Sequence, residues 1–191
     1  LYYYVQGFIQ KGLKYYERAL REFRRIGERA NSILCMTNLA SCYLLLYQPE
    51  VAKKYLDQAN SLLRASTNLI SKLGFELNMV SYCIETQQSE LGISYAVRAW
   101  ETVQKHGRQN LIVVTAGLYV ESLLLTDQQL HMKKIQFLID QLAGELAKKP
   151  PPNRQTAAHI RLGIALALNG EKERATEHQQ KAKSLMDVHQ F

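Results

Sequence analysis

The stretch from Leu34 to Leu63 constrains the fold more than any other part of the sequence. Apolar residues recur in it at spacings of three and four, the period of one face of an α-helix. Gln48, Pro49 and Glu50 interrupt the pattern, and proline is tolerated at a helix start because no backbone donor is needed there. The two stripes are Met36, Leu39, Ala40 and Tyr43, then Val51, Ala52, Tyr55, Leu56, Ala59 and Leu62. The stretch therefore predicts an antiparallel helical hairpin.

Small residues lie where these two helices are expected to cross. Ala40 and Ala52 allow a close approach, since the distance between packed helices follows the side chains at the contact. This order of residues resembles the tetratricopeptide repeat (TPR) family, with Met36 where the family usually has Trp and without the family's closing proline. The resemblance implies a unit of about 34 residues that stacks with its neighbours into a right-handed superhelix.

The same pattern predicts further hairpins along the chain. Gly12 marks the expected turn of the first, and Asn169-Gly170 marks the turn of the last. The expected hairpins are about 1–30, 32–65, 68–106, 110–148 and 153–187. The run from Lys148 to Arg154 holds three prolines and is either a loop into the last hairpin or a boundary that detaches it. We expect a single all-α domain over residues 1–191, built as antiparallel helix hairpins stacked in a right-handed TPR-like α-solenoid.

Composition gives little support to strands or to a membrane span. Only 10 glycines and 4 prolines occur in 191 residues, and alternating β-branched patterns are almost never sustained. The longest apolar run, from Leu111 to Leu125, contains Glu121 and is shorter than a typical span, so we expect no membrane insertion. Because the sequence begins at Leu1 rather than Met, we expect a fragment of a longer protein.

The cysteines predict a reducing environment, because their number, 3, is odd and none has CxxC spacing. We therefore expect an intracellular protein, cytoplasmic or nuclear. Cys35 and Cys42 stand where the family usually has small apolar residues. We interpret them as buried small hydrophobic side chains rather than as a redox or metal pair.

No motif in the sequence predicts catalysis. GxSxG, HExxH and P-loop patterns do not occur, and carboxylates are interleaved with Lys and Arg as on a solvated helix face. The histidines are scattered without the spacing of metal ligands, at His106, His131, His159, His178 and His189. We therefore expect no enzyme, no metal and no cofactor.

A basic stripe is predicted on the second helix of the first expected hairpin. Its residues recur at spacings of four, three and four: Lys14, Arg18, Arg21 and Arg25. The stripe is either a solvated face, partly neutralised by nearby glutamates, or a docking surface for an acidic protein or, less favourably, for phosphates. Aromatic residues are not interleaved with these bases as in a platform for single strands, so nucleic acid is the weaker hypothesis.

The resemblance to TPR proteins also implies a concave groove, lined by the first helix of each unit, in which a peptide or partner helix can lie. Amide and hydroxyl groups can donate to and accept from a peptide backbone, and tyrosine adds area with a polar tip. Tyr4 and Phe8 fit equally well as packing residues between helices. Registration on the family selects Tyr4, Phe8, Thr37, Asn38, Ser41, Asn78, Ser81, Tyr82, Glu85 and Arg161.

One TPR subfamily holds the carboxylate of an EEVD-type chaperone tail with a clamp of Lys, Asn and Arg. The places that match this clamp hold Tyr4, Phe8, Asn38, Asn78 and Tyr82. Only Asn38 agrees with the clamp residues, so the sequence argues against this ligand.

These patterns predict a non-enzymatic scaffold that binds a peptide segment or helix of a protein partner in its groove. The alternative is a TPR sensor or regulatory domain of a larger signalling or transcription regulator, and a nucleic-acid-binding module is a third hypothesis. The sequence identifies neither the partner nor the oligomeric state.

Overall fold

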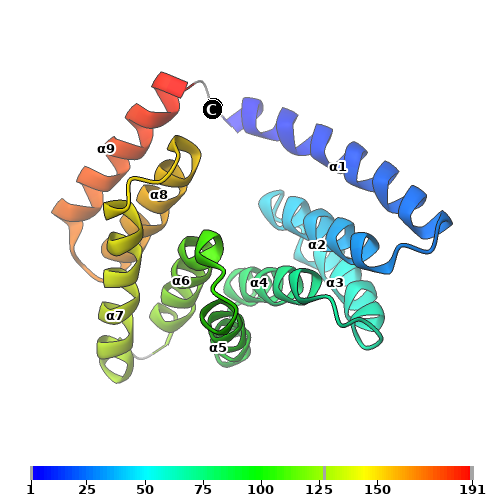
Figure 1. Ribbon diagram of the computed structural model, residues 1–191. Coiled ribbons are helices and arrows are strands. Elements are labelled where there is room, and N and C mark those ends of the chain that lie inside the picture. Colours follow the sequence, from blue (N-terminus) through cyan, green and yellow to red (C-terminus); the bar gives the residue numbers. More distant parts are fainter. Residues whose placement is uncertain (1, 127, 190–191) are drawn as a thin grey trace. The chain divides into compact units, whose positions relative to one another are not determined.

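The computed structural model describes the backbone of residues 2–126 and 128–189, and the side chains of residues 8–108, 110–126 and 130–188 (Figure 1). Regular structure in this part of the chain is entirely α-helical, which confirms the predicted fold class. The helices are α1 (Tyr2–Arg25), α2 (Arg29–Leu45), α3 (Pro49–Leu63), α4 (Leu69–Glu85), α5 (Ser89–Lys105), α6 (Gln109–Leu124), α7 (Gln128–Ala147), α8 (Pro152–Leu168) and α9 (Lys172–His189).

The chain divides into two compact units, residues 1–88 and residues 89–191. The first unit contains α1 to α4, and the second contains α5 to α9. The boundary falls between the two helices of the expected hairpin 68–106 and not at the proline-rich run from Lys148 to Arg154. That run leads directly into α8, which has a proline in its first turn.

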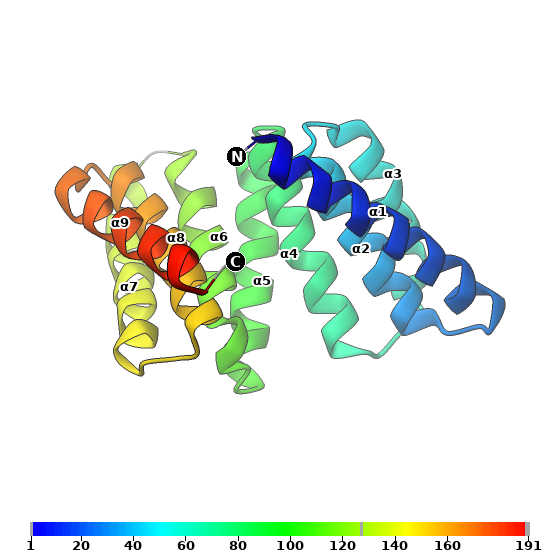
Figure 2. The ribbon, with the colours of Figure 1, turned by 90° about the horizontal axis from the view of Figure 1, so that it is seen from above.

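The central helix of the first unit is α2. It packs against α1, against its hairpin partner α3 and against α4, and α3 also contacts α4 (Figures 1 and 2). Met36 and Leu39 of α2 and Leu56 of α3 are fully buried, as their helical spacing predicted. The core of this unit therefore surrounds α2.

The hairpin of α2 and α3 follows the sequence closely. Tyr47 takes the positive φ of 56° in the turn, and Pro49 begins α3. Ala40, Ala52 and Ala59 are fully buried. Their small side chains permit the close helix approach that the sequence predicted at Ala40 and Ala52.

The hairpin expected over residues 1–30 is wrong, because α1 is one continuous helix. The expected turn at Gly12 lies inside this helix, and the buried Leu13 and Leu20 keep one face of it against the unit core. A β-carbon on Gly12 would lie 3.7 Å from Cys42 Sγ of α2. This glycine marks a close approach between two helices rather than a turn.

The central helix of the second unit is α6. It contacts α5, α7 and α8, while α7 contacts α8 and α8 contacts α9. The predicted turn at Asn169-Gly170 lies between α8 and α9, where Gly170 has a φ of 86°. Helices α5 to α8 thus repeat the order of the first unit, one leading helix, then a hairpin, then a further helix packed on that hairpin, and α9 is added on α8.

Candidate functional site

In the first unit, α2 and α4 pack side by side and run in the same direction. Ser71 Oγ on α4 donates to the carbonyl of Ala30 on α2 at 3.1 Å, and a β-carbon on Gly74 would lie 3.5 Å from Leu34 Cδ2. These two contacts set the register, because parallel helices advance together by the same rise per residue. Residues 38 and 78 therefore lie at one level, and residues 41 and 81 lie at the next.

Four polar side chains share the half-buried face that this register creates, and we refer to Asn38, Ser41, Asn78 and Ser81 as the amide face. Asn78 Nδ2 donates to the Gly74 carbonyl at 2.9 Å, and Ser81 Oγ donates to the Leu77 carbonyl at 3.2 Å. These bonds hold both side chains against α4. Within the described residues, the Oδ1 of Asn78 is buried and accepts no hydrogen bond. The second N–H of the Asn78 amide and the side chains of Asn38 and Ser41 remain as hydrogen-bonding groups of the amide face.

Thr37 was predicted to line the same surface, and this prediction is wrong. Its side chain is only 1% exposed, and its Oγ1 donates to the Leu34 carbonyl at 3.0 Å. Gly74 brings α4 close to Thr37, which family registration alone does not reveal. Tyr82 is half-buried and Glu85 is exposed, both on α4.

The other predicted groove residues do not lie on α2 or α4. Tyr4 belongs to α1, and its side chain lies outside the described residues. Phe8 of α1 is 56% exposed, with Lys11 Nζ 6.0 Å from its ring centroid. Arg161 belongs to α8 in the second unit, where it forms an ion pair of 2.5 Å with Glu121. A role in partner binding stays a prediction for each of them.

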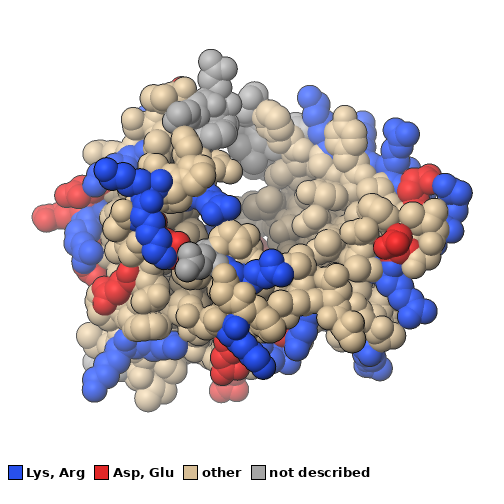
Figure 3. All heavy atoms as spheres, in the orientation of Figure 1, with Lys and Arg blue, Asp and Glu red and all other residues tan. Residues whose placement is uncertain are grey.

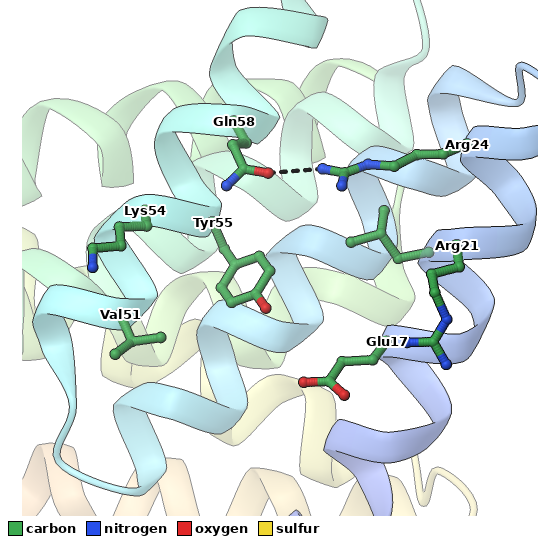
Figure 4. A pocket seen from close by; sticks show the side chains of 8 residues that line it. Glu17, Arg21, Arg24, Val51, Lys54, Tyr55 and Gln58 are labelled. Carbon is green, nitrogen blue, oxygen red and sulfur yellow. Dashed lines mark hydrogen bonds between the residues drawn. The ribbon is translucent and has the colours of Figure 1, made fainter.

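A second candidate site is a cleft of about 420 Å³ between α1 and α3 (Figure 4). Each helix lines it with residues at i, i+3, i+4 and i+7, which share one helix face. Figure 4 shows the two rows of side chains on either side of the gap. We refer to these residues as the basic cleft: Glu17, Leu20, Arg21 and Arg24 of α1, with Val51, Lys54, Tyr55 and Gln58 of α3.

Arg24 bridges the basic cleft. Its guanidinium donates to Gln58 Oε1 at 2.7 Å and to Met36 Sδ at 3.5 Å. Both acceptors are neutral, so they position the guanidinium without compensating its charge. Within the described part of the chain, Arg21 and Lys54 form no ion pair. The cleft therefore carries an excess of positive charge.

Tyr55 forms an aromatic wall of the basic cleft. Its ring stacks on the ring of Tyr43 of α2, with centroids 5.6 Å apart and planes at 12°. Burial raises the pKa of Tyr43, and the neighbouring Tyr55 and the Glu17 carboxylate raise it further. The Tyr43 phenol is therefore neutral at physiological pH and adds no negative charge to the cleft.

The predicted basic stripe is exposed on α1, and only part of it enters the cleft. Figure 3 shows Lys and Arg side chains along the outer side of α1. Arg21 lines the cleft, whereas Arg25 Nε pairs with Glu22 Oε2 at 3.0 Å. The exposed members of the stripe are Lys14, Arg18, Arg21 and Arg25.

Sequence reasoning missed the α3 side of the cleft and the role of Arg24. Arg24 and Gln58 are 34 residues apart, so no local pattern joins them. The i, i+3, i+4 and i+7 spacing on both helices is the signal that could have indicated facing stripes.

The amide face and the basic cleft lie on opposite sides of α2. Met36 and Tyr43 contact cleft residues. Asn38 is two positions after Met36, and Ser41 is two positions before Tyr43. Because two positions correspond to a rotation of about 200° around an α-helix, both residues lie on the other side of α2. The two surfaces are therefore separate.

The second unit contains a histidine pair that the sequence did not reveal. His159 of α8 and His178 of α9 are half-buried, and their Nδ1 atoms lie 2.8 Å apart. At this distance the Nδ1–H of one ring donates a hydrogen bond to the unprotonated Nδ1 of the other, so both rings can be neutral. Burial is the main cause that lowers the pKa of both imidazoles, and Lys181 lowers each further. The neutral pair joins α8 to α9.

Lys134 of α7 lies among three aromatic rings of the second unit. Its Nζ is 5.2 Å from the ring centroid of Phe137, 5.4 Å from that of Tyr119 and 6.0 Å from that of Trp100. The rings of Trp100 and Phe137 also meet edge to face at 6.1 Å. These contacts connect α5, α6 and α7, and exposed cation–π contacts contribute about 0.5–1 kcal/mol each.

The cysteines are buried free thiols, and burial raises the pKa of Cys35, of Cys42 and, to about 11, of Cys83. The interpretation of Cys35 and Cys42 as buried small side chains is confirmed. Across the described residues, no three side chains of His, Cys, Asp or Glu gather as metal ligands would.

Comparison with known proteins gives one family-model match, over the first part of the chain, and a similar fold. Residues 1–65 match the family model for the tetratricopeptide repeat. Among solved structures, the chain is similar to a variant of a "putative kinesin light chain" with nearly identical TPR-like repeats from Podosopora anserina. The two structures superpose with a TM-score of 0.59 at 14% sequence identity. The match covers 96% of this chain and 89% of that chain. At this identity the likeness shows the fold alone, an all-α helical-repeat solenoid. No curated protein matches the sequence.

Among the described helices, none combines the length and apolar character needed to cross a membrane.

Proposed function

We propose that this chain, whose residues 1–65 match the tetratricopeptide repeat model and whose fold is TPR-like, is a non-enzymatic interaction module. Its amide face binds an extended peptide segment or a helix of a protein partner. TPR proteins in general bind protein partners on extended surfaces created by stacked repeats. The parallel register of α2 and α4, which sets two amides and two hydroxyls side by side, carries this proposal.

The chemistry of the amide face suits a peptide backbone. Each residue of an extended peptide offers one N–H donor and one carbonyl acceptor. Asn38 can offer both kinds of partner, Ser81 can accept, and Asn78 keeps one amide N–H for a peptide carbonyl while its Oδ1 is buried. A typical hydrogen bond of this kind contributes about 0.5–1.5 kcal/mol, so affinity depends on several of them together.

A peptide library displayed on phage, selected against the intact chain, supplies ligands for a quantitative test. We expect the double variant Asn38→Ala/Asn78→Ala to bind a selected peptide about tenfold more weakly by calorimetry, since it loses two hydrogen-bonding side chains. Its helicity should be unchanged and its melting temperature no lower.

The matched control is Asn60→Ala, an exposed asparagine of α3 in the same unit. It should bind the peptide as the unmodified chain does. Equal affinity of the Asn38→Ala/Asn78→Ala variant and the control for every selected peptide would contradict the proposal.

The proposed compartment is intracellular, cytoplasmic or nuclear. The buried free thiols support it, because structural thiols persist in reducing compartments. Fluorescence microscopy of the tagged full-length protein tests it, and secretion into the medium would contradict it.

A further inference from the structure

The basic cleft holds more positive charge than its surroundings neutralise. Arg21, Arg24 and Lys54 contribute three cations, against the single carboxylate of Glu17 among the lining residues. Lys53, beside the cleft on α3, is already paired with Asp57 at 2.5 Å. Uncompensated cations at a concave surface attract anionic partners, and the attraction is stronger where water is partly excluded.

The size of the cleft matches a short stretch of polypeptide. Its volume of about 420 Å³ lies in the ordinary range for ligand-binding sites. Each lining stripe covers seven residue steps, which is about 10 Å along a helix. An extended peptide advances about 3.3 Å per residue, so roughly three residues fit along the cleft.

The lining also selects the kind of anion. Leu20, Val51 and the ring of Tyr55 provide an apolar floor and wall between the cations. Glu17 would repel a phosphate backbone, which carries a charge at every unit, more strongly than a peptide whose carboxylates alternate with an apolar side chain. The surface therefore favours an acidic peptide over nucleic acid.

We propose that the basic cleft between α1 and α3 binds an acidic segment of a protein partner. Carboxylates of the segment lie against Arg21, Arg24 and Lys54, and an apolar or aromatic side chain between them packs on Leu20 and Tyr55. Arg24 is held in position before binding by Gln58 and Met36, which lowers the entropic cost of ordering it.

Fluorescence polarisation with the intact chain tests this site. The probe is a fluorescein-labelled peptide Asp-Glu-Phe-Glu-Asp, and its isosteric control is Asn-Gln-Phe-Gln-Asn. Unlabelled oligothymidylate serves as the nucleic-acid competitor. We expect binding of the acidic peptide alone, weakened as the salt concentration rises from about 50 mM to about 300 mM because exposed charges are screened.

Charge variants then locate the binding. We expect Arg21→Glu/Lys54→Glu to weaken acidic-peptide binding by at least about tenfold. Lys133→Glu/Lys183→Glu, exposed lysines of the second unit, makes the same change in net charge and should weaken it no more than about twofold. Glu17→Gln should tighten binding about two- to threefold, a gain that misfolding cannot produce.

Three results would overturn the proposal: no binding of the acidic peptide at low salt, equal losses in the two charge-reversal variants, or displacement of the peptide by oligothymidylate at lower concentration than by the peptide itself. The amide face lies on the opposite side of α2. Asn38→Ala/Asn78→Ala should therefore bind the acidic peptide normally, which separates failure of this proposal from failure of the proposed function.

Discussion

Cys83 of α4 is fully buried, and burial raises the pKa of its thiol from 9.0 to about 11. Alkylating agents react with the thiolate, so at pH 8 the reactive fraction is roughly a hundredfold below that of an ordinary cysteine. We expect iodoacetamide to modify Cys83 far more slowly in the native chain than in guanidinium, as followed by mass spectrometry. Labelling at the same rate in both states would contradict its burial.

The pair of His159 and His178 makes the second unit sensitive to acid. Because burial lowers both folded-state pKa values below the ordinary 6.5, the unfolded chain takes up protons first as the pH falls. The contribution of the pair to the free energy of unfolding is fully present above pH 6.5 and decreases below it. The decrease levels off once the histidines of the folded chain are also protonated. Lys181 and Arg174 oppose the added charge on His178, and Glu177 favours it.

We expect the melting temperature to fall between pH 7.5 and pH 5.5, and to fall less in a His159→Phe/His178→Phe variant, because that variant has no buried imidazoles to protonate. The control is His106→Phe, an exposed histidine outside the pair. An identical pH dependence in the unmodified chain and the double variant would show that the pair does not contribute.

Thr37 and Asn38 illustrate what the sequence can predict at single residues. Both are small polar residues at adjacent positions of α2, and both fit a binding surface by registration on the family. One is buried against α4 and the other is partly exposed, since α4 covers one side of α2 only. The difference depends on the approach of α4 at Gly74, a tertiary contact that helical periodicity does not contain.

At the scale of elements, α1 is the clearest departure from expectation. A glycine near the middle of an apolar stripe fits a turn as well as it fits a helix that approaches another closely. The apolar stripe continues unbroken through the buried Leu13 and Leu20, and this continuity favours a single helix. The turns that the sequence did predict had two signals each, a break in the stripe together with Pro49 or with Asn169-Gly170.

Two glycine variants test the continuity of α1. Gly12→Ala should increase the free energy of unfolding by about 0.5–1 kcal/mol, because alanine favours a helix and its β-carbon makes only ordinary contacts. Gly27→Ala should decrease it by about 1–2 kcal/mol, because the φ of 76° at that position is strained for an L-residue. Urea unfolding followed by circular dichroism measures both.

The two variants are matched in chemistry and differ only in backbone conformation. If Gly12→Ala destabilised the chain as much as Gly27→Ala, Gly12 would lie in a turn and the hairpin over residues 1–30 would be restored.

At the scale of the whole molecule, each unit repeats one packing order around a central helix, α2 in the first and α6 in the second. Helical periodicity predicted most of the helices and the class of fold. It could not predict the basic cleft, which joins residues 34 apart at Arg24 and Gln58, or the histidine pair, which joins residues 19 apart. Those sites exist only once helices distant in sequence pack together.

In the proposed function, a partner peptide lies on the amide face. A photoreactive benzoylphenylalanine at Glu85, exposed on α4 at the end of that face, should cross-link to a phage-selected peptide on irradiation. The same group at Asn60, exposed on α3, should give little product. Mass spectrometry of the products measures the ratio: strong cross-linking at Glu85 alone is the predicted result, and equal or greater cross-linking at Asn60 would contradict the claim.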